Sequence, residues 1–165
     1  MTKTEIIDVN YDERLREWRV VSTGQGTREL GTYDTKMSAM GQAKNIAEEE
    51  HRFGVVVTRQ RDGSIYDVWW PESHRRIKVE PVTERRLEKM HRKGQFDASE
   101  APVWGVYRRR DGSRYSLIDA HKTQSAASEA ATEEAEEANV RKVVITDENR
   151  RKQREWLHPL ERHWR

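Results

Sequence analysis

The feature that most constrains the fold of this chain is an internal repeat. A shift of 88 residues, which takes position 35 to position 123, superposes two segments of the second half on the first half without a gap. Nearer the start of each copy the shift becomes 86 residues and pairs Trp18 with Trp104. Such a repeat indicates that one small supersecondary unit occurs twice, with two extra residues in a loop of the second copy. The matched segments are an alanine-rich stretch, 35–49 with 123–137, and a β-branched stretch, 55–58 with 143–146.

Each copy has the sequence pattern of two hairpins with a helix between them. In the first copy, Ala39, Ala43 and Ala47 recur on one face of a helical period, and Asp34 or Thr35 can cap this helix. The segments on either side alternate or are rich in β-branched residues, which predicts strands. The strands of the first copy are expected over 17–22, 29–33, 55–58 and 65–70.

The predicted fold class is therefore α+β, with two tandem ββαββ units. Each unit is expected to be a small antiparallel sheet with one Ala-rich helix on one face. We place the first repeat at 1–76 and the second, with its basic, Trp-containing C-terminal tail, at 102–165. The residues between them, 77–101, are interpreted as a charged linker with a short helix inside 83–93.

The two equivalent tryptophans, Trp18 and Trp104, are expected to anchor the two cores. A face of small alanines lets a helix approach its sheet closely and leaves room for a large ring beside it. The predicted core residues are Trp18, Val20, Ala43, Ala47 and Val56 in the first repeat, and Trp104, Val106, Ala131, Ala135 and Val144 in the second.

Composition excludes several classes of protein. Hydrophobic residues make up 34% of the 165 residues and charged residues 36%, so a large enzyme core is not expected. The net charge of +2 and the six tryptophans still favour a folded chain. No stretch approaches the roughly 18 apolar residues of a membrane span, and the N-terminus lacks the apolar core of a secretory signal. We expect a cytoplasmic protein without membrane contact, or one inside a virus-like particle if it is a structural component.

No pattern in the sequence predicts catalysis or a cofactor. The absence of cysteine excludes disulfides, thiol chemistry and Cys-based zinc sites. The histidines lack metal spacing; His158 and His163, for example, are five residues apart and do not share one helical face. Gly24 and Gly26 precede a strand rather than a helix, so they predict a hairpin turn and not a phosphate-binding loop. We expect no enzymatic activity, no cofactor, no metal and no small-molecule substrate.

The motifs of the first copy resemble a known family. They are Trp18-x-Val20, Asp34-Thr35-Lys36, Val55-Val56-Val57 and Asp62-Gly63-x-Ile65. Together they resemble the DUF2188 family of small domains, for which no activity is established. The resemblance covers about 16–70 well and 104–159 more loosely, because the second copy lacks an Asp-Gly pair after its third strand. It implies a fold and no chemistry. The tandem arrangement is also similar to that of the DUF1508 family, by analogy only.

Charge is unevenly distributed in the second copy. Its helix is rich in glutamate and its strand segments in arginine, so the sheet face away from the helix is expected to be basic. Alternation sends Trp69 and Trp70 to opposite faces, which leaves one ring away from the helix. Exposed tryptophan beside arginine is typical of protein interfaces and of base-stacking surfaces. The residues predicted to contact nucleic acid or a partner are Arg108, Arg109, Arg110, Arg150, Arg151, Lys152, Arg154, Trp70, Trp156 and Trp164.

The function predicted from the sequence is binding. The first hypothesis is a non-enzymatic interaction or structural component of a multi-subunit assembly, for example a phage- or virus-like particle. It rests on size, because units of about 60 residues bury too little surface to be stable alone. A protein partner or self-association is then expected. The alternative is a nucleic-acid-binding protein that uses the basic sheet face and the C-terminal tail. Salt separates the two, because phosphate neutralisation weakens steeply as salt rises.

Overall fold

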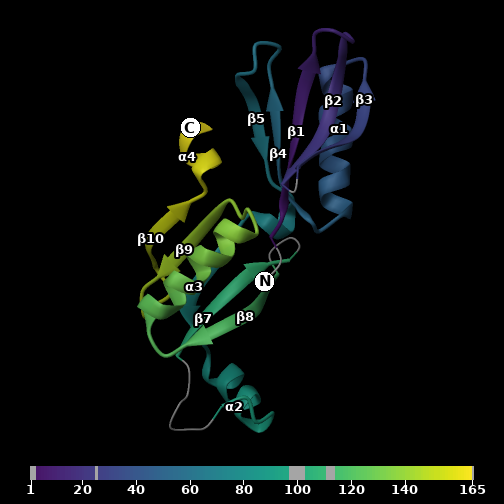
Figure 1. The fold of residues 1–165 in the computed structure, drawn as a ribbon. Helices are drawn as coiled ribbons and strands as arrows, with labels where there is room; N and C mark the ends of the chain where they lie inside the picture. The colour runs from purple at the N-terminus through teal and green to yellow at the C-terminus, as the bar shows by residue number, and fades with distance from the viewer. Residues whose placement is uncertain (1–2, 25, 97–102, 111–113, 165) are drawn as a thin grey trace.

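The chain folds into two halves of the same architecture (Figure 1). The computed structural model describes residues 3–24, 26–96, 103–110 and 114–164, with the backbone alone at Trp164. Each half is a five-stranded mixed sheet with one long helix packed against it. Among the described residues, no helix has the length and hydrophobicity that a membrane span requires.

The first half contains β1 (Glu5–Asp12), β2 (Glu17–Gly24), β3 (Gly26–Tyr33), α1 (Lys36–Glu49), β4 (Phe53–Arg59) and β5 (Ile65–Trp69). Its strand order is β3-β2-β1-β4-β5. β1 pairs parallel with β4 at the centre, and every other neighbouring pair in this sheet is antiparallel. A short 3₁₀ helix, η1 (Glu72–His74), follows β5 and leads into the second half.

The second half contains β6 (Ile77–Pro81), α2 (Glu84–Arg92), β7 (Trp104–Arg109), β8 (Tyr115–His121), α3 (Gln124–Glu137), β9 (Lys142–Thr146), β10 (Lys152–Leu157) and α4 (Pro159–Trp164). Its strand order, β10-β9-β6-β7-β8, repeats that of the first sheet. β6 pairs parallel with β9, as β1 does with β4. The repeated unit is thus βββαββ, with α2 inserted after the first strand of the second copy.

The α+β class and the tandem halves are confirmed, but the prediction of small, purely antiparallel ββαββ sheets is wrong. Each sheet gains a first strand, β1 or β6, that lies at its centre and makes it mixed. Residues 13–16 join β1 to β2, whereas 82–103 join β6 to β7. Because these connections differ so much in length, the shift that aligns the rest of the repeat does not align the first strands.

The segment 77–101, interpreted as a linker, begins with a strand of the second sheet. β6 pairs with both β7 and β9, so it belongs to the second core. The short helix expected inside this segment is α2, where the Thr83 hydroxyl accepts a hydrogen bond from Arg86 N. The last part, 97–101, lies outside the described residues.

The two long helices begin and pack in equivalent ways. The hydroxyl of Thr35 accepts a hydrogen bond from Ser38 N, and that of Thr123 accepts one from Ala126 N, each at 3.1 Å. Such N-caps satisfy backbone donors that the first helical turn leaves free. Trp104 is half-buried and packs against the second core. Eight other predicted core residues are buried: Trp18, Val20, Ala43, Ala47, Val56, Val106, Ala131 and Ala135.

Val144 lies on the sheet face away from α3, contrary to its predicted place in the core. Val143 and Ile145 face the helix instead. The helices match at a shift of 88 residues, but the core valines Val56 and Val143 match at 87, because Val143 follows the cap Thr123 by 20 residues and Val56 follows the cap Thr35 by 21. A one-residue change in register moves alternate side chains to opposite faces of a sheet.

This register predicts different costs for neighbouring valines. Replacing Val143 by alanine is expected to lower the free energy of unfolding by about 1–2 kcal/mol, because it leaves a cavity against α3. The same change at Val144 is expected to cost about half as much or less, since that side chain is only partly buried. Urea unfolding of both variants measures the difference. A larger loss at Val144 than at Val143 would contradict the register.

Candidate functional site

Asn139 joins the two halves through hydrogen bonds. It follows α3 with a φ of 52°, a left-handed conformation that asparagine adopts more readily than most residues. Its backbone oxygen accepts from Trp70 Nε1 at 3.0 Å, and its Nδ2 donates to Thr4 O at 2.9 Å. Its Oδ1 lies 3.0 Å from His158 Nε2. One residue of the second half thus holds the beginning of the chain, the end of β5 and the segment before α4.

Trp70 is part of this junction and is not available to an outside partner. Its ring is 3% exposed and packs with Val55, Val57 and Val68 on the face of the first sheet opposite α1. Leu160 of α4 packs against the same cluster, and α4 contacts β5 at the edge of the first sheet (Figure 1). The second half therefore covers part of the first sheet, and the predicted contact role of Trp70 is corrected to an internal one.

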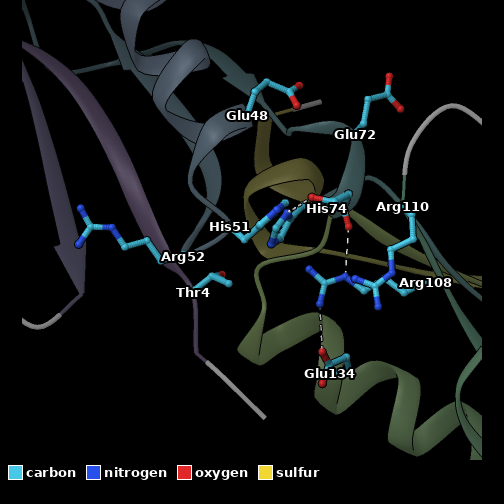
Figure 2. A pocket seen from close by; sticks show the side chains of 10 residues that line it. Thr4, Glu48, His51, Arg52, Glu72, His74, Arg108, Arg110 and Glu134 are labelled. Atoms are coloured by element: carbon cyan, nitrogen blue, oxygen red, sulfur yellow. Dashed lines mark hydrogen bonds and ion pairs between the residues drawn. The ribbon is translucent and has the colours of Figure 1, made fainter. Parts of the chain in front are cut away.

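A hollow of about 790 Å³ lies where the two halves meet (Figure 2). Its charged groups are balanced and mostly paired within the chain. Glu72 pairs with Arg75 at 2.7 Å and with Arg109 at 3.1 Å, so its carboxylate is neutralised on both sides. A hollow with this balance does not select an anion or a cation. It is lined by Thr4, Glu48, His51, Arg52, Glu72, Ser73, His74, Arg108, Arg110 and Glu134.

Arg108 is built into the wall of this hollow. Its Nη1 lies 3.2 Å from Glu134 Oε1, and its Nε donates to Ser73 O at 3.1 Å. Burial lowers the pKa of this guanidinium, while Glu134 opposes that change. Arg108 lies on the α3 side of the sheet, so its predicted contact role on the basic face is wrong.

Ser73 and His74 form the one pair in the hollow that resembles catalytic machinery. Ser73 Oγ lies 2.9 Å from His74 Nδ1. Burial, followed by the charges of Arg108 and His51, lowers the pKa of His74 to about 3. So weak a base is poorly suited to activate a hydroxyl near neutral pH, so the pair is best described as a structural hydrogen bond. In the described part of the chain, no group of three or more acidic or histidine side chains could hold a metal ion.

The face of the second sheet opposite α3, which we call the open face, carries a different set of side chains. The pairings of Lys78 with Tyr107 and with Val144 place one residue from each of β6, β7 and β9 on this face. Glu155 of β10 pairs with Val144 and extends the face to the sheet edge. Alternation from these positions adds Lys142, which lies two residues before Val144.

Cations gather on the open face around Lys142. Burial lowers the pKa of Lys142, and the charges of Arg76, Arg141 and Lys152 lower it further, whereas Glu155 raises it. Lys142 therefore lies among more positive than negative neighbours. Crowding of like charges disfavours the charged form of each group and is relieved when an anion approaches.

Two more cations border the open face near Tyr107. Burial raises the pKa of Tyr107, as does Glu80, whereas Arg86 of α2 and Arg150 of the β9–β10 turn lower it. The charges of both arginines reach this ring, and Arg150 Nη2 also donates to Pro81 O at the end of β6, at 3.1 Å. We call the resulting surface the basic face and define it as Arg76, Lys78, Arg86, Lys142, Arg150 and Lys152.

The predicted contact residues Arg150 and Lys152 belong to the basic face, and two others lie near it. Arg151 is exposed in the turn beside Arg150. Arg109 lies on the open face, where its Nη2 is 3.1 Å from Glu72 Oε2.

The predicted contact residues Arg110 and Arg154 lie on the α3 side instead. Arg110 lines a second hollow with Glu133 and Glu134 of α3. Arg154 pairs with the core residue Ile145 and also lies beside glutamates of α3. These arginines therefore offset the acidic helix and do not add to the basic face.

The C-terminal tryptophans give little support to an exposed aromatic site. Trp156 is half-buried, pairs with Val143 and packs against the second core, as Trp69 does against the first. This packing leaves part of the Trp156 side chain exposed, and its predicted contact role stays a prediction. The side chain of Trp164 lies outside the described residues.

The predicted contact residues leave out four members of the basic face: Arg76, Lys78, Arg86 and Lys142. Lys78 and Arg76 were assigned to a linker or its border, because strand β6 was not recognised. The alternation of Ile77 and Val79 with Lys78 was the available signal, since it is typical of a strand with one polar face.

Family models, curated proteins and solved structures were compared with the chain, and none of them matches it. The resemblance to the DUF2188 family therefore stays a prediction, and any function has to be argued from the surface of the molecule.

Proposed function

We propose that the protein is a non-enzymatic nucleic-acid-binding protein that holds phosphate groups on its basic face. The observation that carries this proposal is that strand alternation places Lys78 and Lys142 together on the open face, with Arg150 at the end of β6. Burial and positive neighbours lower the pKa of Lys142, which agrees with this arrangement, although Glu155 opposes the change. Phosphate oxygens placed among these side chains would remove the repulsion and release counterions from the nucleic acid.

Most cations of the basic face are not neutralised within the chain. Lys78 Nζ lies 3.4 Å from Glu80 Oε1, and Lys152 Nζ lies 2.9 Å from Glu155 Oε2. The Lys152 pair is exposed, and such a pair is weak and can exchange its carboxylate for a phosphate, whereas the Lys78–Glu80 pair is partly buried. In the described part of the chain, four cations have no carboxylate within 4.0 Å: Arg76, Arg86, Lys142 and Arg150.

The burial of tryptophan shifts the balance from a protein interface toward nucleic acid. The residues predicted to contact a protein partner or nucleic acid included Trp70 and Trp156. Both rings pack within the chain, and the junction through Asn139 supplies the stabilising contact between small units. The large apolar patch that an obligate protein interface needs is therefore not provided by these residues.

Self-association is the second candidate, and the polarity of the second half favours it. α3 carries exposed Glu129, Glu133 and Glu136 on the side opposite the basic face. The acidic side of one copy complements the basic face of another, and such unlike surfaces join into open chains. This alternative corresponds to the predicted structural component, and sedimentation at low salt tests it directly.

The proposed function predicts a strong effect of removing charge from the basic face. Replacing Arg86, Lys142 and Arg150 together by glutamine is expected to weaken binding of random duplex DNA by at least about tenfold at about 50 mM salt. It is also expected to reduce the slope of log affinity against log salt by about 2.7, or about 0.9 for each lost phosphate contact. Fluorescence anisotropy with labelled DNA measures both quantities.

A matched control removes the same charge from the first half. Arg14, Arg28 and Arg61 are exposed there, and replacing all three by glutamine leaves the basic face intact. This control is expected to bind like the unaltered protein. If both triple variants weakened DNA binding equally, the loss of affinity would follow from net charge alone. That result would argue against a site on the basic face.

A further inference from the structure

We infer that the nucleic acid is a duplex, gripped through its phosphate backbone, with α2 as a cationic arm that extends the basic face. This inference rests on the proposed function and names the class of nucleic acid. Three observations carry it: the tyrosine rings of the open face are largely covered, α2 projects from the body of the protein, and three exposed cations of α2 lie in one row.

The tyrosines of the open face offer little exposed ring for base stacking, because Tyr107 is buried and Tyr115 is half-buried. Tyr107 is 8% exposed, and Lys78 Nζ lies 5.9 Å from the centre of its ring. The same ammonium lies 4.2 Å from the centre of the Tyr115 ring. Proteins that hold single strands without sequence preference stack the bases on open aromatic rings. The described part of this surface presents ammonium and guanidinium groups instead, which suit phosphates.

α2 projects beyond the second sheet and none of its residues is buried (Figure 1). A helix of this length has little stability of its own and usually packs an apolar face against a neighbour. The rest of α2 is exposed, and its own Arg86 lies at the border of the basic face. A large ligand that contacts the sheet can therefore also reach α2.

The exposed cations of α2 follow one helical face. Arg85, Lys89 and Arg92 are spaced i, i+4 and i+7, which places them in a single row. All three are exposed, whereas Arg86 is half-buried toward the sheet. The helix spans about 14 Å, close to the width of about 12 Å of the DNA major groove. The row can therefore follow phosphates beside a groove while the sheet holds an adjacent stretch of backbone.

The charge of α2 favours nucleic acid as its ligand. Its basic residues, Lys93 included, outnumber Glu84 and Glu88, so the exposed helix repels a basic partner and attracts a polyanion. Two phosphate-binding surfaces set side by side suit two adjacent backbones, which a duplex presents at fixed separation. A flexible single strand binds less tightly, because it loses conformational entropy on binding and no base stacking compensates for that loss.

Competition between duplex and single-stranded DNA of the same sequence tests the inference. At about 50 mM salt, the labelled duplex is expected to bind at least about tenfold more tightly than the single strand. Replacing Arg85, Lys89 and Arg92 together by glutamine is expected to lower duplex affinity about tenfold or more and to remove most of this preference. Far-UV circular dichroism verifies that the variant keeps its helices, and the Arg14, Arg28 and Arg61 triple variant is the control.

The outcomes separate this inference from the proposed function. A single strand that binds as tightly as the duplex, with no effect of the α2 variant, would overturn the duplex inference while nucleic-acid binding stands. A loss of duplex affinity that is as large in the control variant would also overturn it. If neither DNA binds at low salt, the proposed function fails and the inference fails with it.

Discussion

Replacement of Trp70 by alanine lowers the free energy of unfolding by about 3–5 kcal/mol, the cost typical of deleting a buried aromatic ring. The ring fills the cluster between the first sheet and Leu160 of α4, and its Nε1 donates to Asn139 O. The substitution therefore removes packing and a hydrogen bond that join the two halves. Thermal or urea unfolding measures the loss, and separate transitions for the two halves are an expected accompaniment.

Replacement of Trp70 by phenylalanine is the matched control. It keeps most of the ring but cannot donate to Asn139 O, so the expected cost is smaller, about 1–2 kcal/mol. The prediction is chiefly that the loss of unfolding free energy is larger for Trp70→Ala than for Trp70→Phe. A Trp70→Ala protein that melts like the unaltered chain would contradict the placement of this ring in the junction.

Mild acid is expected to destabilise the protein through two buried histidines at the junction. His158 Nδ1 accepts a hydrogen bond from Leu160 N at 3.1 Å, so Nε2 carries the proton that is donated to Asn139 Oδ1. Protonation of Nδ1 would remove the acceptor at the start of α4. Burial lowers the pKa of His158 to about 4, and burial with the charges of Arg108 and His51 lowers that of His74 to about 3.

The direction of the pH effect follows from these depressed values. An unfolded histidine has a pKa near 6.5, so below that pH the unfolded chain binds more protons than the folded one. Stability is therefore complete above about pH 6.5 and falls as the pH drops toward the folded pKa values. Each ring contributes at most about 1.4 kcal/mol per pH unit below pH 6.5, so the two together lower stability by at most about 4 kcal/mol at pH 5.

Urea unfolding between pH 7 and pH 5 tests this prediction while most carboxylates remain ionised. His158→Gln is expected to be less stable at pH 7 but to lose less stability on acidification. His91→Gln, a change at an exposed position of α2, is expected to keep the full pH dependence. Stability of the unaltered protein that stays constant over this range would refute the neutral, buried state of both rings.

Much of the fold follows from patterns in the sequence, because the helices and four strands of each half have clear local signals. The alanine rows and the caps at Thr35 and Thr123 predict α1 and α3 directly. β1 and β6 were missed because the repeat offset breaks at the α2 insertion, so that these two first strands do not align with each other. Alternation at Ile7 and Val9 was the only local trace of the first of these strands.

The surface was harder to predict than the fold, because it depends on register. A one-residue difference after α3 decides that Val144 and Lys142 face away from the helix while Val143 faces it. The arginines of the strands likewise divide between the two faces of the second sheet. Arg108 lies on the α3 face, where it pairs with Glu134, and does not belong to the basic face. The burial of Trp70 depends on docking between halves, which no local pattern encodes.

Mapping amide chemical shifts of the ¹⁵N-labelled protein during titration with a short random duplex DNA tests the central claim most directly. At low salt, we predict changes that cluster in β6, β9, the β9–β10 turn and α2, with Lys78, Lys142 and Arg150 among the affected positions. The amides of α1 and β3 are expected to stay unchanged, because they lie in the other half. Changes confined to the first half, or none at any ratio of DNA to protein, would contradict nucleic-acid binding by the basic face.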